Sequence, residues 1–328
     1  MSHSNPTVTA LAGVQVGHAQ DLKHRTGTTV VLLTPPAMAF AGIRGGWPGS
    51  YDTAGSDLGR TFFNYHALFL TGGDIYGYDA SIGIRRFLLD KGLAKPRGAG
   101  RMPAIMGTNI YDVDFGPLEG RDYVALGESA CRNASSRAVT QGTVGAGTGA
   151  TVGPFFADRE LKGTKGGLGS SAAKVGPWTV GTVVVTNSVG NVCDPFEGRT
   201  IAGTHRRGTK AFLEMDDLLD DYLKRSSTRF GTTIGVVGTD APLDHEQLAR
   251  LVELAHDGLA LAVRPAHMST DGDALLGFCT GRRPPKRLDY RAFDVLHNVA
   301  VREVARAALN AVGKATGLGG YEGLADGQ

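Results

Sequence analysis

A threonine at the start of a β-type run, Thr232, could act as a nucleophile in this chain without a cofactor. It follows Gly231 and precedes Thr-Ile-Gly-Val-Val. A threonine hydroxyl is a weak nucleophile, but a free α-amino group on the same residue, with a pKa of roughly 7.7–8.0, can serve as its general base. That amine exists only if the chain is cut between Gly231 and Thr232. Glycine suits a strained scissile bond because it lacks Cβ.

Two aspartates, Asp271 and Asp273, lie on either side of Gly272 further along the chain. Paired carboxylates can orient a nucleophile together with its ammonium group. An EF-hand is excluded, because it needs more acidic positions and a glutamate at the end of its loop, whereas Ala-Leu-Leu-Gly-Phe follows here. The alternative is an ordinary surface turn capped by aspartates.

Asn187 ends the apolar run that begins at Val183, and its side-chain amide could donate to a developing oxyanion. A turn asparagine is the structural alternative. Residues 142–153 form a glycine-rich run that partly matches a dinucleotide-binding fingerprint at Gly145, Gly147 and Ala150. A fingerprint should follow an apolar strand and open a helix, but polar residues precede this run and Pro154 ends it. A backbone loop at the substrate or oxyanion side is therefore favoured, with a nucleotide-binding oxidoreductase as the alternative.

Strands and helices that could position these residues alternate along the chain. Five β-rich runs predict strands, at Thr28–Leu33, His66–Leu70, Val180–Thr186, Thr232–Val237 and Ala274–Cys279. Helical periodicity predicts helices at Ala80–Leu89, at Thr209–Leu223, from Asp244 onward, and at Tyr290–Val312. The polar residues 224–231 predict an exposed loop just before Thr232. This pattern predicts a layered α/β or α+β fold.

Composition narrows the functional classes. With 34 basic and 32 acidic residues, the net charge of +2 gives no field for nucleic acid or an anionic membrane. The three cysteines, Cys131, Cys193 and Cys279, have neither disulfide nor zinc-site spacing. No signal peptide or membrane-length apolar run is visible, so a cytoplasmic location is expected. Glycine is frequent, with 48 residues inside apolar segments, and predicts sites built from main-chain groups.

Taken together, the motifs resemble one family almost along the whole chain. This family contains L-aminopeptidase/D-esterase, the β-peptidyl aminopeptidases and the nylon-oligomer (6-aminohexanoate oligomer) hydrolases. The motifs that carry the resemblance are, in order, Gly13–His18, Thr26–Val30, Leu70–Asp79, Val144–Gly153, Lys165–Ser170, Thr232–Val237, His256–Ala260 and Asp271–Asp273.

The resemblance implies an αββα sandwich, one structural domain over residues 1–328, and self-cleavage into subunits 1–231 and 232–328. It implies homo-oligomers, commonly tetramers, and no metal or organic cofactor. By motif, Thr232 matches the nucleophile, and Asp271 and Asp273 match the polar pair that holds it. Asn187 matches the oxyanion-hole asparagine, and Tyr111 matches a tyrosine that lines the site. The expected substrates are small peptides or oligoamides.

Two positions depart from the family pattern. Gly231 is similar to the residue that precedes the nucleophile in the aminopeptidases. The aspartate pair is closer to the nylon-oligomer branch, in which asparagine often precedes the nucleophile. Many relatives have a lysine where this chain has Pro154; if that lysine assists catalysis or processing, either Lys165 substitutes for it or the role is missing. A non-catalytic homologue that has lost processing is therefore a further alternative to the expected amide hydrolase.

Overall fold

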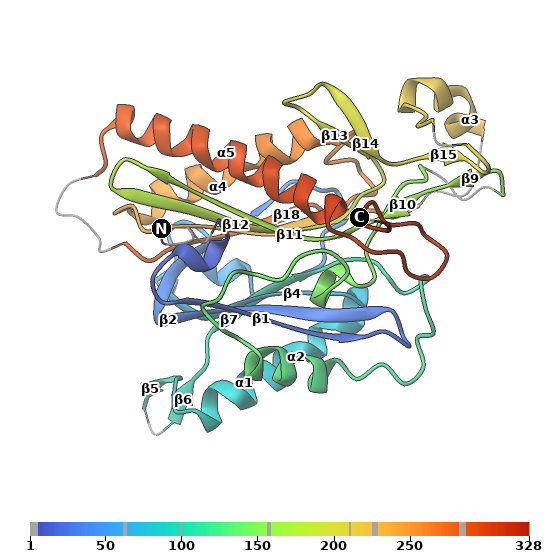
Figure 1. The fold of residues 1–328 in the computed structure, drawn as a ribbon. Helices are drawn as coiled ribbons and strands as arrows, with labels where there is room; N and C mark the ends of the chain where they lie inside the picture. Colours follow the sequence, from blue (N-terminus) through green and yellow to red (C-terminus); the bar gives the residue numbers. More distant parts are fainter. Residues whose placement is uncertain are drawn as a thin grey trace.

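The computed structural model describes residues 6–61, 64–98, 100–155, 159–209, 211–224, 229–281 and 287–327. Helices lie on both outer faces of a stacked pair of sheet layers (Figure 1). The α-helices are α1 (Ala80–Asp90), α2 (Tyr123–Arg132), α3 (Leu219–Lys224), α4 (His245–Ala262) and α5 (Tyr290–Gly313). Among the described residues, no helix combines the length and apolar character needed to cross a membrane.

Nine strands form the main sheet, in the order β11-β12-β16-β18-β2-β4-β7-β3, with β1 paired to β2. Their bounds are β1 (Val14–Asp21), β2 (Thr26–Ile43), β3 (Ser50–Tyr51), β4 (Asn64–Thr71), β7 (Ile105–Asn109), β11 (Gly167–Val175), β12 (Trp178–Asn187), β16 (Thr232–Thr239) and β18 (Ala274–Cys279). The short strands are β5 (Lys95–Arg97), β6 (Gly100–Met102), β8 (Thr151–Val152), β9 (Leu161–Lys162), β10 (Thr164–Lys165), β13 (Asn191–Asp194), β14 (Arg199–Ala202), β15 (His205–Arg206) and β17 (Val263–Arg264).

The long strand β2 joins the two sheet layers. Its first part pairs with β1 and β4, its last part pairs with β18, and the register with β4 shifts between Leu32 and Ala37. One layer therefore contains β1, β4 and β7, and the other contains β11, β12, β16 and β18. Because both faces of each layer are covered, strands such as β16 are buried at every position.

Three apolar layers hold this sandwich together. One lies between the sheet layers and includes Leu68, Val183, Val236 and Leu276. A second packs α4 and α5 on β12, β16 and β18, and a third packs α1 and α2 on β2 and β4 (Figure 1). The order is helices, sheet, sheet, helices, and the predicted αββα sandwich is confirmed.

The strand predictions and three helix predictions match observed elements. Asp244 caps α4 as expected, since its side chain accepts from the Gln247 N–H. The helix predicted over Thr209–Leu223 is wrong in extent, because the described residues of that stretch contain only a 3-10 turn, Met215–Leu218, followed by α3. Four aspartates lie in these two short elements, and acidic residues are poor interior helix formers when they crowd together.

Candidate active site

Thr232 is the first residue of β16, at the end of the antiparallel ladder with β12. Its register partner is Asn187, the last residue of β12. The β-branched residues of both strands favour this pairing, and the ladder fixes the two side chains relative to each other. Thr232 is only 5% exposed. Its Oγ1 donates a hydrogen bond of 2.5 Å to the carbonyl oxygen of Gly231, across the very peptide bond predicted to be cut.

Gly231 packs tightly beside the aspartate loop. Its carbonyl oxygen accepts from the Gly272 N–H at 3.0 Å, and Gly231 forms a parallel bridge with Asp271. A Cβ at position 231 would lie 2.3 Å from the Val189 nitrogen and 2.8 Å from Asp271 Oδ1. Only glycine fits this approach, so the residue before Thr232 is determined by the backbone around it. Of the predicted exposed loop, residues 225–228 lie outside the described residues, and Gly231 itself is buried.

The two aspartates contact different groups, and both are almost fully buried. Asp271 Oδ2 accepts from the Met268 N–H at 2.9 Å, while Oδ1 has no hydrogen-bond partner among the described residues. Asp273 Oδ1 accepts from the Thr233 N–H at 2.6 Å, and Oδ2 accepts from the backbone N–H of His267 and lies 2.8 Å from its Nδ1. Asp273 thus fixes the start of β16, whereas Asp271 keeps an unused oxygen beside Gly231.

Burial gives Asp271 an unusual proton affinity. Burial and the neighbouring Asp273 carboxylate raise the pKa of Asp271 to about 7, although the Met268 N–H and His267 favour its ionised form. A carboxyl group that titrates near neutral pH can accept a proton or stabilise a nearby cation.

Asn187 connects Thr232 to two loops. Its Oδ1 accepts from the Thr151 N–H at 2.8 Å, and its Nδ2 donates to the carbonyl oxygen of Tyr111 at 3.1 Å. These two bonds fix the orientation of the amide, with its NH₂ group directed toward Tyr111. One N–H of this group is not used by the Tyr111 bond and is available for another acceptor.

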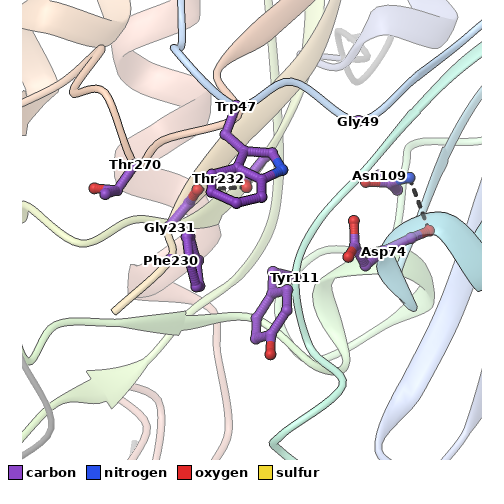
Figure 2. A pocket seen from close by; sticks show the side chains of 9 residues that line it. All are labelled: Trp47, Gly49, Asp74, Asn109, Tyr111, Phe230, Gly231, Thr232 and Thr270. Atoms are coloured by element: carbon purple, nitrogen blue, oxygen red, sulfur yellow. Dashed lines mark hydrogen bonds between the residues drawn. The ribbon is translucent and has the colours of Figure 1, made fainter. Parts of the chain in front are cut away.

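A small pocket opens in front of Thr232 (Figure 2). It has a volume of about 60 Å³. The residues that line it are Trp47, Gly49, Asp74, Asn109, Tyr111, Phe230, Gly231, Thr232 and Thr270. Asp74 and Asn109 lie on the side opposite Thr232, and Phe230 lies between Trp47 and Tyr111 (Figure 2). Tyr111, predicted from the family motif, therefore lies in the same pocket as Thr232.

Tyr111 also forms part of a second, larger cavity of about 330 Å³. Its hydroxyl donates to Asp114 Oδ2 at 2.9 Å, and burial together with the Asp114 carboxylate raises the pKa of Tyr111 to about 12. The phenol therefore stays protonated at neutral pH and is unsuited to act as a base. Tyr111 and Phe230 line both cavities, so these two rings separate them.

The glycine-rich run contributes no residue to the lining of the small pocket, although Gly149 and Thr151 of this run line the larger cavity. Gly145 and Gly147 are buried in a 3-10 turn, where the Ala146 N–H donates to Thr29 Oγ1. A Cβ on Gly147 would lie 2.3 Å from the Leu168 nitrogen, so the glycine permits close backbone packing. The run continues into strand β8, which removes the helix that a dinucleotide fingerprint needs.

Lys165 is completely buried and holds the same run in place. Its ammonium donates to the carbonyl oxygens of Gly147, Ala150 and Gly166 at 3.0, 2.6 and 2.9 Å. Burial lowers the pKa of Lys165 to about 7, and the Asp112 carboxylate opposes this shift. Lys165 is not among the residues that line the pocket, so it reaches Asn187 only through the Ala150–Thr151 backbone.

Six residues line the pocket although none of them was predicted to do so: Trp47, Gly49, Asp74, Asn109, Phe230 and Thr270. Trp47 reaches the pocket because its N–H donates to the Asp271 carbonyl at 2.8 Å, and Gly45 allows this approach. Asp74 follows β4 at a left-handed position (φ 51°), and its carbonyl accepts from Asn109 Nδ2. Phe230 precedes Gly231. The only hint of Asp74 in the sequence was its place in the Leu70–Asp79 motif, where it is a charged residue between two glycine turns.

Comparison with known proteins places this geometry in a family. The sequence pattern of Peptidase family S58 matches residues 6–325. The chain is 33% identical over 307 residues to an uncharacterized aminopeptidase of Mycobacterium leprae, covering 84% of this chain and 78% of that protein. It is 28% identical over 276 residues to a 6-aminohexanoate-oligomer endohydrolase of Kocuria sp., covering 82% and 73%.

A solved structure shares the fold. It is the L-aminopeptidase D-Ala-esterase/amidase of Ochrobactrum anthropi, described as a variant among the Ntn-hydrolase folds. It aligns with a TM-score of 0.69 at 20% identity, covering 97% of this chain and 88% of that one. The expected resemblance is therefore confirmed: this chain belongs to Peptidase family S58, a group of Ntn-like aminopeptidases and amidohydrolases.

Proposed function

We propose that this protein is a self-activating amide hydrolase in which Thr232, once freed from Gly231, is the nucleophile. The observation that carries the proposal is the short contact between Thr232 Oγ1 and the Gly231 carbonyl oxygen, in a buried pocket beside an unpartnered carboxylate oxygen. A hydroxyl in this position is already oriented toward the carbonyl group that it must attack.

Self-cleavage proceeds through an ester. Thr232 Oγ1 bonds to the Gly231 carbonyl carbon, the Gly231–Thr232 C–N bond breaks, and the hydroxyl proton ends on the Thr232 nitrogen. Water then hydrolyses the ester, which yields a Gly231 carboxylate and a free Thr232 amine and hydroxyl. Asp271, with its pKa near 7, is the nearest candidate to take up and return the proton.

Substrate hydrolysis repeats the same chemistry with an external amide. The Thr232 amine accepts the hydroxyl proton, Oγ1 forms an acyl-enzyme, and the departing amine takes the proton. The amide of Asn187 donates to the oxyanion, and Asp271 stabilises the ammonium form of Thr232. Asp273 fixes the Thr233 N–H, and therefore the direction in which Thr232 enters the pocket.

The carboxylate of Asp74 favours substrates that carry a free amino group. The pocket is lined mostly by uncharged groups. Among the described residues, no basic side chain forms an ion pair with the Asp74 carboxylate. An ammonium group on the substrate would supply the missing partner. This fits the aminopeptidase names of the relatives, and a terminal amine is common to short peptides and ω-amino acid oligomers.

The deciding experiment is intact mass spectrometry and N-terminal sequencing of freshly purified protein. Wild type should give two chains, 1–231 and 232–328, and the second should begin Thr-Thr-Ile. Thr232→Ala should remain whole and show no amidase activity.

Thr233→Val is the matched control, because the Thr233 hydroxyl is buried without a hydrogen-bond partner in the described structure and its loss should be tolerated. This variant should still be cut and active. An uncut wild type with full amidase activity would refute the proposal, and an uncut, inactive wild type would favour the non-catalytic homologue.

A further inference from the structure

The ring of Phe230 fills the space in front of Thr232. Its centroid lies 5.0 Å from that of Trp47 and 5.5 Å from that of Tyr111, in an edge-on and a tilted arrangement (Figure 2). With the ring in place, the pocket keeps only about 60 Å³. Small-molecule sites typically need about 300–1,000 Å³. The uncut chain therefore has no room for an amide substrate at Thr232.

Removing the ring would join two cavities. Phe230 and Tyr111 are the residues shared between the small pocket and the neighbouring cavity of about 330 Å³. Arg229 lines that larger cavity, where its guanidinium donates to the Tyr321 hydroxyl and to Thr151 Oγ1. Residues 229–231 thus run through both cavities in order and end at the nucleophile.

Charge favours departure of this segment after the cut. Cleavage creates a carboxylate on Gly231 and an amine on Thr232 at the same point. A Cβ on Gly231 would lie only 2.8 Å from Asp271 Oδ1, so Asp271 lies beside both new chain ends and competes with the Gly231 carboxylate for the Thr232 ammonium. In the described part of the chain, Arg229 donates to two neutral hydroxyl groups and lies over the Tyr321 ring, 5.8 Å from its centroid, but forms no ion pair, and such contacts hold a freed chain end weakly.

The ester formed during self-cleavage has the same connectivity as an acyl-enzyme. In it, Gly231 is the acyl residue on Thr232 Oγ1 and Phe230 is the next residue outward. We infer that the slot between Trp47 and Tyr111, which Phe230 occupies in the uncut chain, becomes the substrate subsite for the acyl group. This inference rests on the proposed function and specifies its substrate class.

The covalent path from the Gly231 carbonyl carbon to the Phe230 side chain sets the length of the acyl group that the slot accepts. Phe230 Cβ is connected to the Gly231 carbonyl carbon through Phe230 Cα and C and Gly231 N and Cα. The aromatic ring of a single α-amino acid acyl group would lie one residue closer to the scissile carbonyl than the Phe230 ring does. The slot therefore selects acyl groups at least as long as a dipeptide, with an aromatic or bulky apolar group at the second residue.

The test uses three p-nitroanilides with fully cut protein: Gly-, Ala-Gly- and Phe-Gly-p-nitroanilide. The last copies the chain's own sequence before the cut. We expect kcat/KM for Phe-Gly to exceed that for Ala-Gly about tenfold, the effect of one well-packed aromatic group between two rings. The Gly compound should be the poorest of the three.

Two variants locate the effect. Trp47→Ala should reduce the Phe-Gly over Ala-Gly ratio to about one, with Trp47→Leu as a milder replacement if the alanine variant folds poorly. Tyr290→Ala removes a comparably exposed aromatic side chain from the start of α5 and should leave the ratio unchanged. Phe230→Ala, once fully cut, should have wild-type kinetics because residue 230 has left the slot.

The outcomes separate the two proposals. Protein cut before Thr232 that hydrolyses all three anilides equally overturns the subsite and leaves the proposed function intact. Altered kinetics in cut Phe230→Ala also overturns the subsite, because the ring would then still occupy it. Cut protein that hydrolyses none of the anilides counts against both proposals, and an uncut but active wild type refutes the function itself.

Discussion

The two walls of the pocket at Thr232 are built by different means. What we name the reaction wall, after the proposed function, consists of Thr232, which lines the pocket, and of Asn187 and Asp271, which pair with Thr232 and Gly231 without lining it; all three are buried. The recognition wall consists of Trp47, Asp74 and Tyr111, which lie in segments between strands, whereas Asn109 beside them is the buried last residue of β7. Trp47 is 65% exposed.

This difference separates chemistry from selectivity. On the reaction wall, backbone hydrogen bonds set each side chain, so a substitution there disturbs several contacts at once. On the recognition wall, aromatic rings and one carboxylate face the pocket with few bonds to the main sheet, so they can vary without altering the nucleophile. Four substitutions test whether the division is this sharp.

Asn187→Ala should have the largest effect, because it removes the proposed oxyanion donor. The expected loss in kcat is about 10²–10³-fold, or roughly 3–4 kcal/mol, with a much smaller change in KM. Steady-state kinetics on cut protein separate the effect on kcat from the effect on KM. A thermal melt measures how much stability is lost with the Thr151 and Tyr111 contacts. A change in KM without a change in kcat would assign Asn187 to the recognition wall.

Lys165→Met should destabilise the chain by about 3 kcal/mol, since three buried carbonyl groups lose a charged donor. Lys162→Met is the matched control, because its ion pair with Glu322 lies at the surface and such pairs contribute about 0–1 kcal/mol. Urea unfolding compares the two. Equal stability of both variants would show that the glycine-rich run does not depend on Lys165.

Asp271→Asn should change how stability depends on pH. The pKa of Asp271 is raised in the fold, so its contribution to stability is complete below the ordinary value of 3.8 and is lost as pH rises through about 7. In an uncut Thr232→Ala background, the melting temperature should fall between pH 4 and pH 8, on the order of 5 °C, and the asparagine variant should flatten this fall. An unchanged slope would place the titration elsewhere.

Asp74→Asn should have the smallest effect and should act only on recognition. For substrates with a free amino group we expect KM to rise about tenfold with little change in kcat. N-acetylated versions of the same substrates serve as the control, since they carry no ammonium for Asp74 to bind. If acetylated and free substrates respond alike, Asp74 has a structural role.

The reaction wall is largely predictable from the sequence, whereas the recognition wall, apart from Tyr111, is not. Strand periodicity fixes the ends of β12 and β16, so Asn187 and Thr232 were expected at strand ends, and the structure pairs them directly. Trp47 and Phe230 meet through tertiary packing of segments far apart in the chain. No local pattern encodes such a contact, because neither residue lies in an element with a repeating period.

The glycine-rich run shows the same limit. Its glycines correctly suggested close backbone packing, but the sequence did not reveal what packs there. Gly145 and Gly147 lie outside the lining of the small pocket, and their role as substrate-binding or supporting residues stays a prediction. The sequence singled out Lys165 as a possible substitute for a family lysine, but only the burial of its side chain reveals its role in holding this run.

The position of β16 in the sheet has a consequence for the life of the activated protein. A break before Thr232 leaves residues 232–328 threaded through the middle of the molecule, because β16 and β18 lie between β12 and β2, with α4 and α5 packed over them. The two pieces would remain together without a covalent link. Once melted, however, they would have to find each other from solution, so recovery should depend on protein concentration and activation should be a one-way event.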